Sequence, residues 1–110
     1  MKTQETTVPS TLIPMETLEL VTPMLRAVAH PIRLRILDYL RHEAEPRSVS
    51  EIERASGTQQ AVVSQQLRIL KDQGVLSCQR QGNYVYYEIA TPHVLLILDC
   101  IRAHGRGSSC

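Results

Sequence analysis

Residues 58–89 constrain the fold of this chain more than any other stretch. In the first half of the stretch, apolar residues recur at the spacing of one helix face, and polar residues fill the opposite face. The apolar residues are Val63, Leu67 and Leu70. Gly74 then ends the pattern, because glycine readily adopts the left-handed conformation at which helices stop. We therefore expect an amphipathic helix that packs on a core through one side only.

A pair of strands is predicted directly after this helix. Residues 75–81 and 84–89 have the length of strands, and in the second segment successive side chains would alternate between the two faces of a sheet. Gly82-Asn83 lies between them and can adopt the positive φ values of a tight hairpin turn. The sequence thus predicts a helix followed at once by a two-stranded hairpin.

A second, shorter helix is predicted just before the first one. Ser48 and Glu51 have the spacing of a capping box, in which each side chain accepts a hydrogen bond from the backbone N–H of the other residue. The helix that they begin would run to Ser56, where Gly57 supplies a left-handed stop. Thr58 is then expected to cap the longer helix. Two helices joined by so short a turn form a helix-turn-helix unit.

Proline residues indicate where the remaining helices begin, because proline fits the first turn of a helix. The expected starting points are Pro14, Thr22-Pro23, His30-Pro31 and Thr91-Pro92. The helix from residue 22 would be short and end near Ala29, the next would run to about Glu43, and the last would end near His104. Residues 43–47 would form a charged loop.

The last of these helices is apolar on nearly every side. Its apolar residues are Val94, Leu95, Leu96, Ile97, Leu98, Cys100, Ile101 and Ala103. A terminal helix on a small domain cannot bury all of these side chains against its own core. The excess is best buried against the same helix of a second copy, so the sequence predicts a homodimer.

Composition places the chain among small globular domains. A length of 110 residues with 43% hydrophobic residues corresponds to one domain, and with only 4% aromatic residues the core must be aliphatic. The domain is expected to span residues 14–105, between a flexible N-terminal arm (residues 1–13) and a flexible tail (residues 106–110). The net charge of +1 still permits a local basic patch, since residues 21–42 and 58–110 are each net positive.

The sequence also predicts a cytoplasmic protein with no membrane partner. No signal peptide is visible, and the longest apolar run, Val94 to Leu98, is far shorter than a membrane span. The three cysteines are an odd number, which fits reduced thiols.

The polar face of the longer helix fits the major groove of duplex DNA, because amide and hydroxyl groups can bond to base edges and basic groups to phosphates. The expected base readers are Gln60, Ser64 and Gln65. The expected phosphate contacts are Thr58, Arg68 and Lys71, with Ala61 on the same face. The residues near the hairpin tip that could reach an adjacent minor groove are Arg80, Gln81 and Asn83. The competing interpretation is a solvated face on a structural helix, and the helix-turn-helix spacing and the hairpin argue against it.

Two segments of the chain resemble the ArsR/SmtB family of bacterial winged-helix repressors. The opening signature of the family is similar to residues 25–40, LRAVAHPIRLRILDYL, and its recognition helix and wing are similar to residues 62–89, VVSQQLRILKDQGVLSCQRQGNYVYYEI. The resemblance covers roughly residues 15–105. It implies a homodimer whose interface is built from helices at both ends of the chain. It also implies binding to an imperfect palindrome in double-stranded DNA, with repression that an inducer relieves.

The metal site of that family is incomplete here. The zinc pattern of the last helix keeps His93 and His104, but Thr91 stands where Asp is expected and Gly107 where the final ligand is expected. The two histidines are about 16 Å apart along one helix, at roughly 1.5 Å per residue, so they cannot bind one ion within a chain. In an antiparallel dimer, a mixed set of His93, Cys100 and His104 from two chains could bind a zinc-like ion. The simpler interpretation is that Cys100 is a small core residue and the histidines lie at helix ends.

A thiol switch is the alternative sensor. Some members of the family detect arsenite, persulfide or oxidants with paired cysteines. Cys100 in the last helix and Cys110 in the tail could approach each other or pair across a dimer. Cys78 lies in a predicted strand and fits a structural role. The sequence leaves open whether the inducer is one of these species, a zinc-like ion, or none.

Two other classes of function fit the sequence less well. A winged-helix module that binds protein instead of DNA would present an apolar or acidic face, and this face is neither. An enzyme could use Cys100 and His104, one helical turn apart, as nucleophile and base. Nothing in the sequence marks an oxyanion hole, a phosphate loop or a substrate cleft, so we expect no catalytic activity.

Overall fold

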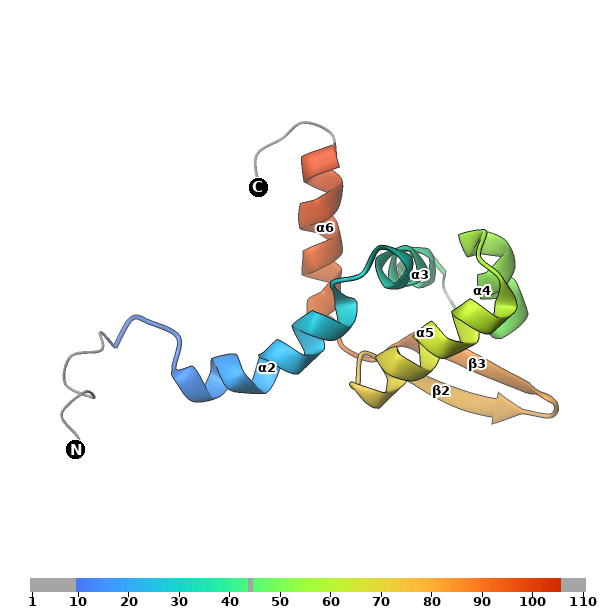
Figure 1. Cartoon of the computed structure of the whole chain (residues 1–110), viewed down its shortest axis with the longest axis horizontal. Coiled ribbons are helices and arrows are strands. Elements are labelled where there is room, and N and C mark those ends of the chain that lie inside the picture. The colour runs from blue at the N-terminus through green and yellow to red at the C-terminus, as the bar shows by residue number, and fades with distance from the viewer. Residues whose placement is uncertain (1–9, 44, 106–110) are drawn as a thin grey trace.

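The computed structural model describes residues 10–43 and 45–105. Along the chain, the described elements are α2 (Met15–Val28), α3 (Pro31–Arg41), β1 (Arg47–Ser48), α4 (Val49–Ser56), α5 (Gln60–Asp72), β2 (Leu76–Gln81), β3 (Tyr84–Ile89) and α6 (His93–Gly105). Helices α3, α4 and α5 gather near the hairpin of β2 and β3, while α2 and α6 extend away in different directions (Figure 1). The predicted fold, mainly helical with a small antiparallel sheet, is confirmed. Residues 1–9 of the expected arm and the whole expected tail lie outside the described residues.

An aliphatic core holds the helices and the sheet together, as the shortage of aromatic residues predicted. Its most deeply buried apolar side chains are those of Ile36, Leu37, Ile52, Val63, Leu67, Leu70, Val75, Leu76 and Val94. They come from α3, α4, α5, α6 and the start of the hairpin, so every one of these elements contributes to one cluster. Burying each large apolar side chain contributes about 1.5–3 kcal/mol to folding.

Helix α2 continues through the point where a new helix was expected. Pro23 lies inside α2, so the prediction of a separate helix that starts at Thr22-Pro23 is wrong. The hydroxyl of Thr22 turns back and donates to the carbonyl of Leu18 at 2.6 Å, which takes this side chain away from the role of an N-cap. Pro23 has no N–H to donate to the carbonyl of Glu19, four residues earlier, but both residues are exposed, so water can reach that carbonyl.

Helix α3 begins where His30-Pro31 predicts. The backbone of His30 is extended, and its Nδ1 accepts a hydrogen bond from the N–H of Ile32 at 3.2 Å. The helix ends at Arg41, slightly before the predicted limit at Glu43. The N–H of Glu43 bonds to the carbonyl of Leu40 at 3.2 Å, a tighter turn that closes the helix early.

The sheet has three antiparallel strands in the order β1-β3-β2. Strands β2 and β3 form the predicted hairpin, with Gln81 opposite Tyr84, so that Gly82-Asn83 is a two-residue loop. Gly82 has a φ of 64°, but only glycines have positive φ among the described residues, so the prediction is wrong for Asn83. A positive φ at the first central residue alone is typical of a type II′ turn, which favours glycine there.

The sequence did not predict the third strand. Strand β1 consists of Arg47 and Ser48, which pair with Tyr87 and Tyr86 of β3. The expectation of a loop over residues 43–47 is therefore wrong at Arg47, because two residues are too few to show the alternation of a strand. Pairing with β1 gives β3 a neighbour on both edges and connects the sheet to the start of α4.

Helix α6 leaves much of its apolar surface uncovered. Val94 and Leu98 are buried, but Leu96 is 69% exposed and Ile101 is 46% exposed. The hydroxyl of Thr91, just before the helix, donates to the carbonyl of Gly74 at 2.8 Å and so connects the start of α6 to the end of α5. In the part of the chain that the structure describes, neither α6 nor any other helix is long and apolar enough to cross a membrane.

Candidate nucleic-acid interface

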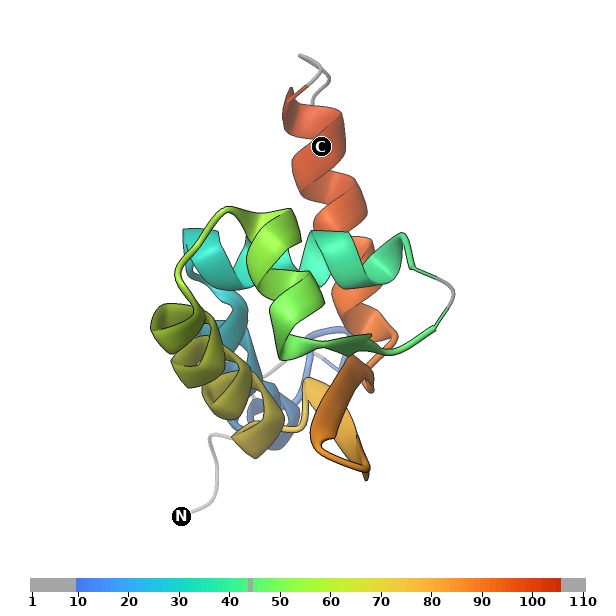
Figure 2. The same ribbon diagram turned by 90° about the vertical axis from the view of Figure 1, so that its right-hand side faces the viewer.

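The predicted helix-turn-helix unit consists of α4, a short turn and α5 (Figure 2). The predicted capping box begins α4: Ser48 Oγ accepts from the N–H of Glu51 at 3.2 Å, and Glu51 Oε1 accepts from the N–H of Ser48 at 2.9 Å. The bond from the Ser48 backbone is the main reason why the pKa of the Glu51 carboxyl lies below its usual value. Gly57 ends α4 with a φ of 72°, as predicted. The capping box and Gly57 thus fix where α4 begins and ends, and Gly57 begins the turn to α5.

Helix α5 begins later than the sequence predicts. Thr58 does not cap it, because the capping position is Gln59, whose side chain makes no capping hydrogen bond. The carbonyl of Gln59 accepts the first helical bond, from the N–H of Val63 at 3.0 Å. The first turn of α5 therefore has N–H groups that its capping residue does not satisfy, and such a helix end suits a phosphate oxygen.

The two sides of α5 divide as predicted. Val63, Leu67 and Leu70 are fully buried on the inner side. On the opposite side lie Gln60, Ala61, Ser64, Gln65, Arg68 and Lys71, all of them exposed except the half-buried Ser64. We call this second set the outer face of α5; Thr58, half-buried, precedes it in the turn. The structure thus brings the predicted base readers and phosphate contacts onto one accessible surface.

The hairpin of β2 and β3 lies near α5 and projects beyond it (Figure 1). The predicted tip residues Arg80, Gln81 and Asn83 are all exposed. Tyr84 is also at the tip and is 58% exposed, with its ring 6.4 Å from the ring of Tyr86. Tyr84 is not among the predicted contacts, although an aromatic residue next to a hairpin turn is a signal for an exposed ring.

Arg68 connects the outer face of α5 with the sheet electrostatically. Burial raises the pKa of Tyr87, the Cys78 thiol opposite it in the ladder raises that pKa further, and the positive charge of Arg68 lowers it. Arg68 is therefore close enough to β3 for its charge to act there. Cys78 is half-buried within the sheet, in keeping with the structural role expected of it.

Two arginines of α3 bond within the protein, which the charge pattern of residues 21–42 does not predict. Arg33 donates to the side chain of Gln66 and to the backbone carbonyl of Ala27. Arg35 donates to the carbonyl of Ser56, at the end of α4, at 3.2 Å. Gln66 is buried although it is polar, and its position beside the apolar residues of α5 is the sequence signal that could have identified it.

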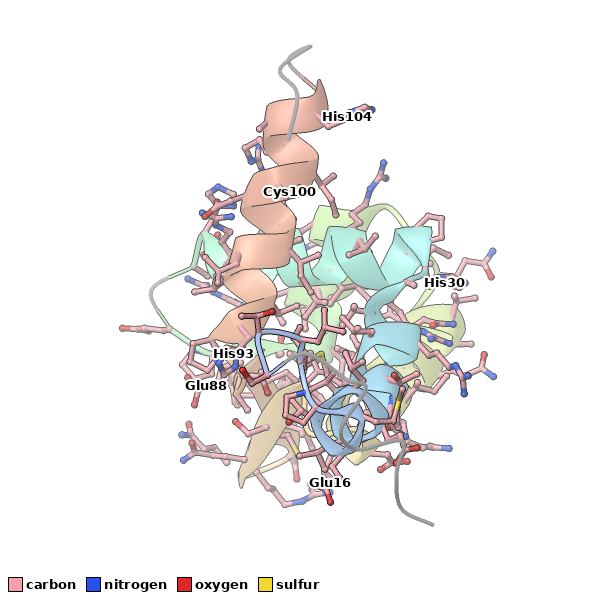
Figure 3. All side chains as sticks on the ribbon, turned by 90° about the vertical axis from the view of Figure 1, so that its left-hand side faces the viewer. Glu16, His30, Glu88, His93, Cys100 and His104 are labelled. Atoms are coloured by element: carbon pink, nitrogen blue, oxygen red, sulfur yellow. The ribbon has the colours of Figure 1, made fainter. Side chains whose placement is uncertain are left out.

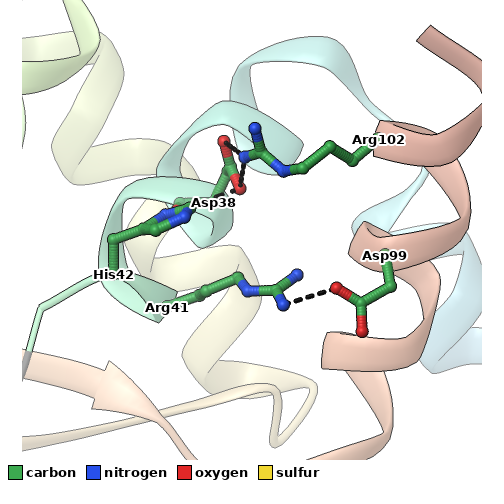
Figure 4. A network of polar contacts seen from close by, with 5 residues as sticks. All are labelled: Asp38, Arg41, His42, Asp99 and Arg102. Carbon is green, nitrogen blue, oxygen red and sulfur yellow. Dashed lines mark hydrogen bonds and ion pairs between the residues drawn. The ribbon is translucent and has the colours of Figure 1, made fainter. Parts of the chain in front are cut away.

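Ion pairs connect α3 to α6 (Figure 4). Arg102 donates to both carboxylate oxygens of Asp38, at 2.5 and 2.6 Å, and Arg41 pairs with Asp99. His42 Nδ1 lies 2.7 Å from the backbone carbonyl of Asp38. Because these side chains remain partly in contact with solvent, we expect each pair to contribute only about 0–1 kcal/mol to stability. They connect the outer part of α6 to α3, in addition to the anchoring of α6 in the core by Val94 and Leu98.

The candidate sensor residues are spread along α6. Figure 3 shows His93 and His104 at opposite ends of the helix, with Cys100 between them. Cys100 is exposed, and the other candidate cysteine, Cys110, lies outside the described residues. Among residues 10–43 and 45–105, no three His, Cys, Asp or Glu side chains gather in a way that could hold a metal ion.

Comparison with known proteins identifies relatives of this chain. The profile of a helix-turn-helix domain family matches residues 28–79. The transcriptional repressor SmtB of Mycobacterium tuberculosis is 38% identical over 93 residues, which cover 84% of this chain and 67% of SmtB. The chain belongs to the ArsR/SmtB family. It is therefore a transcriptional regulator with a winged helix-turn-helix fold, a class of DNA-binding protein and not a class of enzyme.

Solved structures of two relatives of this ArsR/SmtB-family regulator share its fold. NolR from Sinorhizobium fredii superposes with a TM-score of 0.70 at 30% identity, over 92% of this chain and 100% of the NolR chain. A homodimeric winged helix-turn-helix DNA-binding domain from Mycobacterium bovis superposes with a TM-score of 0.69 at 27% identity, over 89% of this chain and 91% of that domain. The match extends over nearly the whole of both proteins, so it includes the helices at both ends of the chain.

Proposed function

We propose that the protein is a homodimeric transcriptional repressor that recognises a specific site in double-stranded DNA through the outer face of α5. The observation that carries the proposal is the outer face itself, which is polar, accessible and placed between the uncapped start of α5 and the wing. This face is neither apolar nor acidic, which argues against a module that binds only protein.

Each part of this surface has a proposed role. The base readers are Gln60, Ser64 and Gln65, since amides and hydroxyls discriminate between base edges. The phosphate contacts are Thr58, Arg68 and Lys71, beside Ala61, whose small side chain permits a close approach. The wing residues for the adjacent minor groove are Arg80, Gln81 and Asn83. Base contacts would set the preferred sequence, and phosphate contacts would set the affinity and its dependence on salt.

The dimer would form through α2 and α6. The large apolar residues exposed in and just before these helices are Leu12, Ile13, Met15, Leu18, Leu20, Leu25, Leu96 and Ile101. Apolar surface of this extent on so small a domain is typical of a protein interface. Two-fold symmetry would place two copies of α5 about 34–36 Å apart, on successive major grooves, so the target would be an imperfect palindrome. The homodimeric state of the M. bovis domain supports the dimer.

A mobility-shift assay with the DNA upstream of the gene tests the proposal. We expect a shift that weakens steeply with salt, that unrelated DNA does not compete away, and that involves one dimer per site. Equal binding to operator and unrelated DNA, at every salt concentration, would contradict it.

We propose further that an inducer releases the DNA through α6. In the sequence, Cys100 lies between Asp99 and Arg102, which form ion pairs with α3, so a chemical change at Cys100 would act next to these pairs. In a reduced chain, arsenite could bridge Cys100 and Cys110; a persulfide or another oxidant could take up two electrons as the two sulfurs form a disulfide and lose two protons. The second candidate is a zinc-like ion held by His93, Cys100 and His104 across the dimer.

The two kinds of inducer can be separated with one variant each. Oxidant, persulfide or arsenite should release DNA from the wild-type chain but not from Cys100→Ser. Zinc should release DNA from the wild-type chain but not from His93→Gln if the metal site operates. Release by every one of these agents from both variants would remove α6 from the mechanism.

A further inference from the structure

Arg33 connects the three helices α2, α3 and α5 on the side of α5 that faces the protein interior. Its Nε donates to Oε1 of Gln66 at 2.6 Å, and a terminal nitrogen donates to the carbonyl of Ala27 at 3.0 Å. The guanidinium therefore connects α3, which carries it, to the middle of α5 and to the end of α2. Gln66 is 8% exposed and Ala27 is 5% exposed, so bulk water competes little for either bond.

The buried apolar residues of α5 hold the helix along one line of its surface. Gln66 comes three residues after Val63 and so lies about 60° around the helix from that line, on the side of α2. A helix held along a single line can still roll about it. A directional bond at the side of the line, such as that between Arg33 and Gln66, opposes this rolling motion.

On the side of α5 that faces α2, close packing of side chains does not by itself prevent this rolling motion. A hollow of about 330 Å³ lies beside Arg33, between α2 and α5. Its other lining residues are Pro23, Arg26, Ala27, Ile69 and Gln73. Interdigitated side chains normally fix the rotation of a helix, and here part of that contact is open space. The two hydrogen bonds of Arg33 are therefore a directional connection from α5, through α3, to the end of α2 beside this hollow.

We propose that Arg33 is a positioning residue for base recognition, which acts through Gln66 by fixing the roll of α5. The inference deepens the proposed function and rests on it. A change in roll would redirect the neighbouring side chains of the outer face, above all that of Gln65. Base readout needs its groups held within about 0.5 Å, whereas the long side chains of Arg68 and Lys71 can follow a phosphate through a small rotation.

The test uses Gln66→Met, which removes the acceptor without a change of charge, and Gln66→Glu, which keeps it. The dissociation constant is measured for the operator, its single-base variants and an unrelated duplex, together with the thermal midpoint. We expect Gln66→Met to reduce discrimination between operator and variants about tenfold, the worth of one good base contact, with affinity for unrelated DNA unchanged. Gln66→Glu should retain the discrimination of the wild type.

Two further variants control for charge and folding. Arg26→Met removes a positive charge at the same hollow without touching the bond between Arg33 and Gln66, and should leave the discrimination between operator and variants unchanged. Gln66→Met alone leaves the Nε of Arg33 unpaired, whereas the double variant Arg33→Met/Gln66→Met removes both ends of that bond. The double variant also removes the donor to the carbonyl of Ala27, so its thermal midpoint is expected to fall, and it should discriminate as poorly as Gln66→Met.

The outcomes separate this inference from the proposed function. A folded double variant with the base preferences of the wild type would overturn the positioning role, as would a loss of thermal stability with discrimination unchanged. Failure of the wild-type chain itself to discriminate would overturn the proposed function, and the positioning role with it, before any variant is compared.

Discussion

Helices α5 and α6 each contain 13 residues and pack on the same core, but they leave opposite kinds of surface uncovered. Helix α5 buries Val63, Leu67 and Leu70 completely and exposes polar side chains. Helix α6 buries Val94 and Leu98 but leaves other large apolar side chains in solvent. An exposed polar face can bind the edges and phosphates of DNA, whereas an exposed apolar face gains free energy only against another apolar surface. This difference is the reason to assign DNA to α5 and a second protomer to α6.

The largest expected effect comes from the buried side of α5. Leu67→Ala should lower the free energy of unfolding by about 2–5 kcal/mol, because it leaves a cavity in a fully buried site. Gln65→Ala, two residues away on the outer face, should change that free energy by no more than about 0.5 kcal/mol. Urea denaturation measures both. Similar losses in the two variants would show that α5 is not buried on one side only.

The corresponding substitution in α6 should act on assembly. Leu96→Glu is expected to weaken the dimer on the order of 100-fold, about 2.7 kcal/mol, because the interface would bury an unpaired carboxylate. Sedimentation equilibrium over a range of protein concentrations measures the effect. Lys71→Glu on the outer face of α5 is the control and should leave the dimer intact. If Leu96→Glu dimerises as strongly as the wild type, the proposal that α6 forms part of the dimer interface is wrong.

A smaller effect is expected at the start of α4, which supports α5. Ser48→Ala should lower the free energy of unfolding by about 1 kcal/mol at pH 7, since it removes the side-chain half of the capping box. Ser48→Thr keeps the hydroxyl, so this variant should retain most of the free energy of unfolding that Ser48→Ala loses. Equal losses in the two variants would mean that the capping bond adds nothing.

The smallest effect concerns the pH dependence of the same box. The pKa of Glu51 is lowered in the folded state, chiefly by the bond from the Ser48 backbone, so its charge stabilises the fold above the unfolded pKa of about 4.3. This contribution is lost as the pH falls through the folded pKa. Glu51→Gln keeps an acceptor without the charge, so the free energy of unfolding of this variant should fall less steeply as the pH is lowered through the unfolded pKa of Glu51 and below it. Urea unfolding at several pH values tests this, and an unchanged slope would contradict it.

The features that the sequence predicted correctly are those that local chemistry determines. The division of α5 follows from periodic burial, because one side of a helix on a small core must be apolar. The capping box of Ser48 and Glu51 and the left-handed Gly57 involve residues a few positions apart. The type of turn at Gly82-Asn83 depends on finer detail, since Asn can adopt either sign of φ.

The features that the sequence did not predict depend either on contacts between distant residues or on short sequence patterns that fit two different structures. The Thr22-Pro23 pair fits a helix start, but it also fits a helix interior in which the threonine bonds backwards. Strand β1 exists only because β3 offers it an edge. Arg33 and Gln66 are 33 positions apart, and their bond depends on how α3 and α5 lie in the folded chain. Long-range pairs of this kind leave no periodic pattern in the sequence.

The most direct test of the central claim compares Gln65→Ala with Lys71→Ala on the operator, on its single-base variants and across a range of salt concentrations. Gln65→Ala should relax the preference at particular base pairs and leave the salt dependence unchanged. Lys71→Ala should weaken binding to all sequences alike and reduce the slope of log affinity against log salt by about 0.9 for each phosphate that is no longer neutralised. Identical profiles for the two variants would contradict the division of the outer face of α5 into base readers and phosphate contacts.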